Sequence, residues 1–280
     1  NQGEIIGFGS ATDAEFDIAT ALIIADEYVR LGRWEQSSSL IYADEARALL
    51  EAIWALEIVD NRYIKPGDLF QGGGRDIVNL SYFSPAWFRL YDTFLGEVRW
   101  TNLIEPGYEA LNATQGSVLG LAPDWSTIEG EPAYDYCDRY GRSRDVCSYD
   151  MGYDGIRVPW RIGLDCILYG DERACIWSQR STTFLNEQQE SHFAKLYNMK
   201  GEIVVDYRDE AMLGMWFFTA IASQDTTLQT RIEWDIYNLA TQDTNHIWAN
   251  RDPYYYNQSL VLFAMSYLAN NSIFLQHLES

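Results

Sequence analysis

The sequence is poor in positive charge. It has 20 lysines and arginines against 41 aspartates and glutamates, which gives a formal net charge of −21. Binding to nucleic acid depends on contacts between Lys or Arg and phosphates, so this balance excludes a nucleic acid as the partner. Apolar runs are also short, and none reaches the ~18 residues of a membrane-spanning helix. A neutral or cationic ligand is therefore expected, and no membrane partner.

Histidine and cysteine are scarce. They stand apart along the chain, at His192, His246, His277, Cys137, Cys147, Cys166 and Cys175. Neither residue type shows the paired spacing of a zinc site, so no metal and no cofactor are predicted. Cys137 and Cys147 flank a polar loop, and two alternatives stay open for them: a disulfide in an exported protein, or free buried thiols. The chain begins at Asn1 without a basic leader or signal peptide, which indicates a mature product or an excerpt.

Aromatic residues, in contrast, are abundant, with 10 Trp and 19 Tyr. In a cleft, such side chains offer flat faces to a ring-shaped ligand. Apolar residues recur at helical spacing along most of the chain, which predicts nine or ten helices and an all-α fold. We expect one domain over residues 1–280, a helical barrel with its active loops on one face. The predicted helices cover residues 11–31, 41–58, 84–94, 98–113, a segment after residue 154, 172–196, 210–222, 228–239, 255–269 and 273–278, with 203–205 extended.

The first predicted helix carries a carboxylate in its first turn. Thr12 is expected to cap the helix while Glu15 reaches back to it, as in a capping box. Asp13 then lies where free backbone N–H groups favour an ionised carboxylate. By itself this position indicates a helix-start charge, or else a fixed hydrogen-bond acceptor.

A second concentration of chemistry lies at residues 153–161, where one carboxylate, two arginines and two aromatics stand together. On spacing alone, a salt-bridged helix start is favoured, with Asp154 near the positive end of the dipole and Arg161 on the surface. The alternative makes Asp154 a catalytic carboxylate beside Tyr153 and Arg157 at the rim of a cleft. Before it, residues 116–152 lose all helical pattern, and a loop of this length and aromatic content is typical of a functional segment.

Three ordered stretches resemble glycoside hydrolase family 8, the inverting endoglucanases and their relatives on an (α/α)6 barrel. Residues 11–19 (ATDAEFDIA) are similar to the first signature of that family. Residues 65–68 (KPGD) and 81–87 (SYFSPAW) resemble the second block, and residues 123–125 (PDW) with 153–157 (YDGIR) resemble the third. The resemblance covers nearly the whole chain and implies an (α/α)6 barrel, here with about ten of the twelve helices.

The resemblance also assigns roles to individual residues. Asp154 matches the general base, and Tyr82 matches a tyrosine that positions the attacking water. Asp13 matches the aspartate that binds the sugar at the cleavage point. Further substrate-binding positions are implied for Tyr153, Arg157, Tyr256 and Phe70, where Phe70 stands in place of a larger stacking residue.

One family residue has no match here. The general acid of the family is a glutamate in a Glu-Gly-x-x-Tyr-Gly segment tens of residues before the Asp13 helix, whereas 12 residues precede Asp13. Glu4 lies in a different context and is not assigned this role. We therefore expect a chain that lacks the N-terminal segment of the family, and that segment is a candidate partner.

The resemblance implies an endo-acting inverting hydrolase of β-1,4-linked polysaccharide, with cellulose or β-glucan as the first choice. Xylan is the nearest alternative substrate, and chitosan is disfavoured because that branch uses another base. The alternative from a different class is a non-catalytic glycan-binding homologue without the acid. Either protein is expected to be secreted or periplasmic, of bacterial type, and to need no cofactor.

Overall fold

The computed structural model of the protein describes residues 8–188, 196–206, 210–242 and 255–269. Within these residues it has ten α-helices and two small antiparallel sheets, so the all-α prediction is confirmed. The α-helices are α1 Thr12–Arg30, α2 Tyr42–Glu57, α3 Pro85–Leu95, α4 Ile104–Ala113, α5 Tyr134–Tyr140, α6 Val158–Tyr169, α7 Glu172–Glu187, α8 Glu210–Ala222, α9 Thr226–Gln242 and α10 Tyr255–Ala269.

Shorter elements connect these helices. The strands are β1 Ile58–Val59, paired with β2 Tyr63–Ile64, and β3 Leu196–Tyr197, paired with β4 Ile203–Val205. The 3-10 helices are η1 Leu80–Tyr82, η2 Trp100–Leu103, η3 Gln115–Leu119, η4 Arg144–Cys147 and η5 Gly155–Arg157. The predicted helix at 273–278, Glu4 and all three histidines lie outside the described residues.

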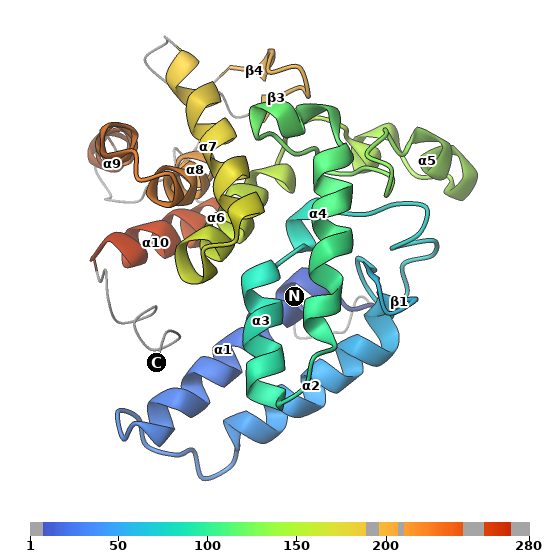
Figure 1. The fold of residues 1–280 in the computed structure, drawn as a ribbon, viewed down its shortest axis with the longest axis vertical. Coiled ribbons are helices and arrows are strands. Elements are labelled where there is room, and N and C mark those ends of the chain that lie inside the picture. Colours follow the sequence, from blue (N-terminus) through green and yellow to red (C-terminus); the bar gives the residue numbers. More distant parts are fainter. Residues whose placement is uncertain (1–7, 189–195, 207–209, 243–254, 270–280) are drawn as a thin grey trace.

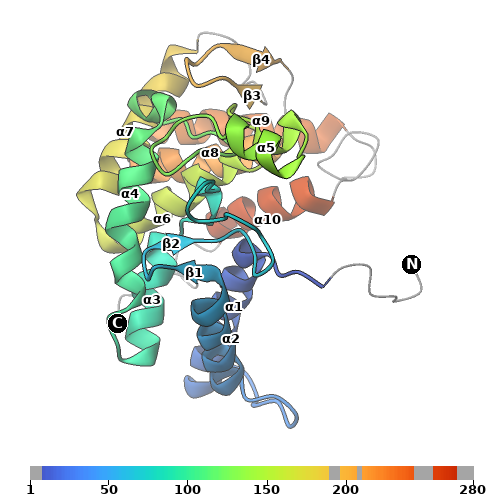
Figure 2. The ribbon, with the colours of Figure 1, turned by 90° about the vertical axis from the view of Figure 1, so that its right-hand side faces the viewer.

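Successive helices pack in pairs. Helices α1 and α2 lie side by side and run in opposite directions, and α3 packs against both α1 and α6 (Figure 1). Helix α8 lies between α6, α7, α9 and α10, while the β3–β4 hairpin lies beside one end of α7 (Figure 2). The α8 residues from Glu210 to Ala220 are all buried, as expected for a helix that is apolar on every side and occupies the centre of a bundle.

An aromatic cluster fixes α1 against α3. Phe16 from α1 contacts the rings of Phe88, Tyr91 and Trp100, with centroid distances of 5.4, 6.2 and 6.0 Å. The Tyr91 hydroxyl donates a hydrogen bond of 2.7 Å to the Phe16 carbonyl oxygen. This packing sets the position of the first turn of α1, which carries Asp13.

Two predictions for helix starts are wrong. Thr12 does not cap α1: Ala11 occupies the N-cap position, and the Thr12 hydroxyl donates instead to the Lys65 carbonyl oxygen at 2.6 Å. The helix predicted at 98–113 is split, because η2 precedes α4.

The open question about the cysteines is also settled, since Cys137 pairs with Cys147 and Cys166 pairs with Cys175.

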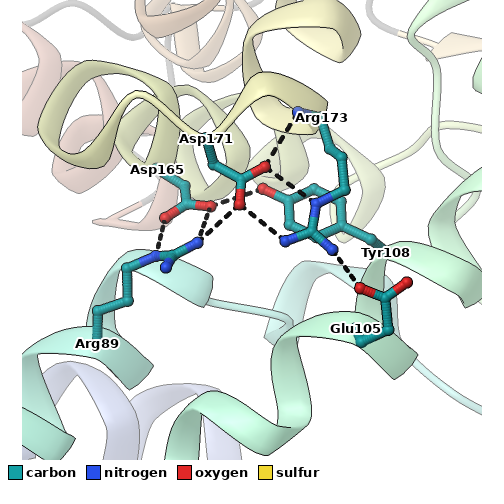
Figure 3. Close-up of polar contacts among 6 residues, drawn as sticks. All are labelled: Arg89, Glu105, Tyr108, Asp165, Asp171 and Arg173. Atoms are coloured by element: carbon teal, nitrogen blue, oxygen red, sulfur yellow. Dashed lines mark hydrogen bonds and ion pairs between the residues drawn. The ribbon is translucent and has the colours of Figure 1, made fainter.

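A polar network joins α3, α4, α6 and α7 and runs from the buried Asp165 to the exposed Glu105 (Figure 3). Asp165, fully buried on α6, accepts hydrogen bonds from Arg89 Nε and from the Tyr108 hydroxyl, each at 2.8 Å. Asp171 binds Arg89 and Arg173 and also caps the N-terminus of α7. Each buried charge in this network is therefore paired.

None of the described helices has the length and apolar content that would let it cross a bilayer.

Candidate active site

Arg157 is the centre of the site. It closes η5, directly before α6, and it is 8% exposed. Its guanidinium donates from Nη1 to Asp13 Oδ2 and from Nη2 to Asp154 Oδ1. One planar cation therefore brings together two carboxylates, one from the first turn of α1 and one from the turn before η5, 141 positions apart (154 minus 13). This joins two of the residues that the family resemblance marked as functional.

Asp13 and Arg157 stabilise each other's ionised forms. Burial of Asp13 disfavours its ionised form, but the charge and hydrogen bond of Arg157 outweigh burial and lower the pKa of the Asp13 carboxyl. Burial likewise disfavours the cation of Arg157, yet Tyr256, Asp154 and Asp13 outweigh it and raise the Arg157 pKa. Asp13 is therefore held as an anion beside a permanent cation.

Asp154 differs from Asp13 in its contact with solvent. Its side chain is 31% exposed, compared with 16% for Asp13. The Oδ1 atom is held by Arg157, so the carboxylate has a fixed orientation while part of it still faces water. A general base needs both properties, because its carboxylate must point at the attacking water and the water must be able to reach it.

Two tyrosines complete this group. The Tyr82 ring lies against the Arg157 guanidinium, with its centroid 5.5 Å from Cζ. Burial, helped by the Asp13 charge, raises the Tyr82 pKa, so the phenol stays protonated. From α10, the Tyr256 hydroxyl donates to the Tyr153 carbonyl oxygen at 2.5 Å, and the rings of these two tyrosines meet edge to face at 5.9 Å. The structure thus brings together Asp13, Tyr82, Tyr153, Asp154, Arg157 and Tyr256.

Residues of this group line two cavities. The larger, of about 840 Å³, has Asp13, Arg157 and Tyr256 in its wall, and most of its remaining lining is apolar and comes from α1 and α10. The second, of about 550 Å³, is lined by more polar residues that include Asp124, Arg144 and Tyr153. Both volumes fall in the range of small-molecule sites. In the described part of the chain, no group of three or more His, Cys, Asp or Glu side chains has the arrangement of a metal site.

Phe70 belongs to a different cluster. Its ring stacks on Trp125 at 5.6 Å and on Tyr136 at 6.1 Å, and the Arg142 guanidinium lies 4.3 Å from its centroid. It also lines a separate cavity of about 510 Å³. The prediction that Phe70 binds substrate therefore remains a prediction, and its packing accounts for an aromatic residue at this position.

Arg161 is not on the surface, so the prediction of a salt-bridged helix start with an exposed Arg161 is wrong on this point. It is 1% exposed, and its two terminal nitrogens donate to the Asp17 carboxylate at 2.5 and 2.8 Å. Its guanidinium also lies 3.8 Å from the centroid of a Trp160 ring. Asp17 follows Asp13 by four residues, and Arg161 follows Arg157 by four. Two Asp–Arg pairs therefore lie one helical turn apart. The equal spacing of four residues in both segments is the sequence feature that could have predicted the second pair.

Asp124 was also missed as a functional candidate. Its Oδ1 accepts backbone hydrogen bonds from Gly152, Asp154 and Gly155, at 2.8, 3.0 and 2.7 Å. Burial nevertheless raises the Asp124 pKa to about 7, with the nearby Asp154 charge acting in the same direction. The motif at residues 123–125 was recognised, but sequence alone did not reveal that its carboxylate meets the turn of Asp154.

Known proteins support the family assignment. Endoglucanase A of Acetivibrio thermocellus is 29% identical over 268 residues, which cover 95% of this chain and 51% of that protein. Endoglucanase 2 of Ruminiclostridium josui is 36% identical over 176 residues, 61% of this chain and 34% of that protein. The chain therefore spans about half, or less, of the length of these two relatives.

Solved structures show the same fold. A β-1,3-1,4-glucanase from Paenibacillus sp. X4 superposes with a TM-score of 0.74 at 20% identity, covering 96% of this chain and 69% of the other. A reducing-end xylose-releasing exo-oligoxylanase gives a TM-score of 0.75 at 20% identity, with 98% and 69% covered. Residues 1–270 match the sequence profile of glycosyl hydrolases family 8. The chain thus belongs to glycosyl hydrolase family 8.

Proposed function

We propose that the protein is an endo-acting, inverting glycoside hydrolase of β-1,4-linked polysaccharide, with cellulose or a related β-glucan as its substrate. The observation that carries the proposal is the Asp154 carboxylate, oriented by Arg157 and exposed to water beside Tyr82. The names of the relatives, Endoglucanase A and Endoglucanase 2, support the choice of substrate class.

In this proposal Asp154 removes a proton from water as the water attacks the anomeric carbon. The bond from that carbon to the leaving oxygen breaks in the same step, and a general acid protonates the oxygen. Tyr82, which keeps its proton, is available to hydrogen-bond the attacking water. The Asp13 anion stabilises the positive charge that develops on the sugar ring.

We place the general acid on a segment outside residues 1–280. Asp13 is unsuited to donate a proton, because its pKa is lowered and the carboxyl is ionised. The effect of Arg157 on this pKa is larger than the opposing effect of burial. The cavity of about 840 Å³ supports a further segment at this point, since its mostly apolar wall from α1 and α10 also includes Asp13 and Arg157. The incomplete coverage of the relatives is consistent with this idea.

Two disulfides support a secreted or periplasmic location. All four cysteines are paired, Cys137 with Cys147 and Cys166 with Cys175. Such bonds persist in oxidising compartments and are rare in the bacterial cytosol.

The test is the stereochemistry of the first product. The full-length protein is incubated with cellulose oligosaccharides, xylan, mixed-linkage glucan and chitosan, and the new reducing ends are followed by NMR. We expect chain fragments from a β-glucan, released first as the α-anomer. Release of the β-anomer would overturn inversion. Cleavage of xylan alone would reassign the substrate.

The second candidate is a glycan-binding protein without hydrolytic activity. The ion pair that ties Asp13 to Arg157 favours it, because a binding cleft needs fixed polar groups but no proton donor. Oligosaccharide binding by calorimetry, without product release by the full-length protein, would support this candidate over the hydrolase.

A further inference from the structure

The turn that carries Asp154 is built around a second aspartate. Three backbone N–H groups converge on the single Oδ1 atom of Asp124, from Gly152 at 2.8 Å, Asp154 at 3.0 Å and Gly155 at 2.7 Å. Such a convergence of N–H groups forms a small anion-binding nest. The carboxyl of Asp124 therefore acts on the backbone of the turn, whereas Arg157 acts on the side chain of Asp154.

Two glycines let the turn close on Asp124. A Cβ atom on Gly152 would lie 2.4 Å from Asp124 Oδ2, and a Cβ on Gly155 would lie 2.4 Å from the Ala122 carbonyl oxygen. Real Cβ atoms do not come so close to another heavy atom, so both positions need glycine. The fit between the turn and residues 122–124 is thus made at backbone contact.

Backbone hydrogen bonds also join the segment that contains Asp124 to the residues before the turn of Asp154. The Asp124 amide donates to the Asp150 carbonyl oxygen at 2.9 Å, and the Trp125 amide donates to the Ser148 carbonyl oxygen at 3.0 Å. Residues 148–155 are therefore attached along their length to residues 122–125. The Asp124 carboxyl is the contact at which this attachment reaches the catalytic turn.

We propose that Asp124 is a positioning residue for the hydrolytic reaction: its carboxyl fixes the turn of residues 152–155 so that the Asp154 carboxylate stays bound to Arg157 and partly open to water. The inference rests on the proposed role of Asp154 as the general base. A base that is displaced by about 1 Å loses on the order of 100-fold in rate, although the chemical groups themselves are unchanged.

The chain offers a matched control in Asp92. Its Oδ1 accepts from the Trp100 amide at 2.9 Å, and its Oδ2 accepts from the Thr101 amide and hydroxyl at 2.9 and 2.6 Å. Asp92 therefore holds the start of η2 by the same kind of contact, in the connection between α3 and α4. It differs from Asp124 in that the turn it holds carries none of the proposed catalytic groups.

The test compares Asp124→Ala, Asp124→Asn and Asp92→Ala in the full-length protein, with Asp154→Asn as the reference. For Asp124→Ala we expect kcat to fall about 100-fold while the Kd for a cellulose oligosaccharide changes less than about threefold. Asp124→Asn keeps an oxygen that accepts the three N–H bonds, so it should recover kcat to within about tenfold of the natural protein. Asp92→Ala should lower the melting temperature and change kcat by less than about threefold, because Asp92 acts on Asp13 only through Trp100, Phe16 and the body of α1.

The outcomes separate the two proposals. If Asp154→Asn is inactive but Asp124→Ala keeps its kcat, the positioning role is wrong while the proposed function stands. If Asp154→Asn keeps its activity, the proposed function itself fails. If Asp124→Ala does not fold, Gly152→Ala replaces it: the added Cβ meets Asp124 Oδ2, and we expect a kcat loss of about the same size. Unchanged kcat in Gly152→Ala would then overturn the positioning role.

Discussion

Two arginine–carboxylate groups in the molecule use the same side chains for different ends. In the inner network of Figure 3, Asp165 is completely buried, and its two oxygens are occupied by Arg89 and Tyr108. At the site, Asp154 is bound by Arg157 through one oxygen, and its side chain is 31% exposed. Exposure rather than ion pairing therefore distinguishes the two groups.

The difference follows from what each group must do. A buried charge costs free energy unless it is fully paired, so the inner network is saturated and can serve stability. A catalytic carboxylate must keep one face for its reaction partner, so the site keeps Asp154 partly open to water.

The largest effect is expected at the open group. Asp154→Asn should lower kcat by roughly 1,000- to 10,000-fold, because the amide cannot accept the proton of the attacking water. Its melting temperature should change little, since the side chain is partly exposed. Steady-state hydrolysis by the full-length protein is the measurement, and Asp171→Asn in the inner network is the control that should keep its kcat. Equal losses in both variants would contradict the contrast.

The closed group should respond in stability instead. Asp165→Ala removes the buried acceptor of Arg89 Nε and of the Tyr108 hydroxyl, while Arg89 keeps its ion pair with Asp171, and we expect a loss of about 1–3 kcal/mol in the free energy of unfolding. Urea denaturation followed by tryptophan fluorescence measures it. The double variant Asp165→Leu/Arg89→Met should regain part of the loss, because it also removes the Arg89 Nε donor that has lost its acceptor. A single variant as stable as the natural protein would show that the network adds nothing to stability.

In a third group, Glu15 is surrounded by other carboxyls instead of being paired with an arginine. Burial of Glu15, then its hydrogen bond with Glu57 and the charges of Glu57, Asp68 and Asp13, raise the Glu15 pKa to about 8. The folded protein therefore holds a proton that the unfolded chain, with a pKa near 4.5, releases. The folded state binds more protons between these values, so stability should decline as pH rises through this window.

Glu15→Gln tests this effect. The amide is neutral at every pH and still donates a hydrogen bond toward Glu57, so the variant should lose less stability than the natural protein as pH rises. Melting temperatures from about pH 5 to about pH 9 measure the difference. Parallel curves for the two proteins would place the pH dependence on other groups.

The smallest effect is expected at the surface. Arg75 binds Asp60 through two nitrogens, yet both side chains are more than half exposed. Solvent and salt screen such a pair, so Arg75→Gln should leave the melting temperature and kcat unchanged within error. A clear loss of stability would mean that exposure is a poor guide to the energy of an ion pair in this protein.

Local patterns in the sequence predicted much of the fold. The bounds of α8 and α10 agree with the predictions for residues 210–222 and 255–269, because continuous apolar and helix-forming runs define both. The true contacts of Thr12 were not predictable, since its hydroxyl bonds a carbonyl 53 residues away. A local capping rule has no access to such a partner.

The site was predictable in its members but not in its arrangement. The family resemblance marked Asp13, Tyr82, Asp154 and Arg157, and the structure brings these four together. The resemblance gave no sign that Asp124 contacts the turn of Asp154, because in that contact the Asp124 side chain accepts hydrogen bonds from backbone N–H groups. Backbone donors carry no residue identity, so the sequence does not reveal which carboxylate they will bind.

The ion pair between Asp13 and Arg157 spans 144 positions of the chain. Contacts of such separation form late in folding, because a long loop must close before they add any free energy. A nascent or partly folded chain thus has no assembled centre, even when its helices are formed. In a refolding experiment, recovery of catalysis should lag behind recovery of the helical circular-dichroism signal.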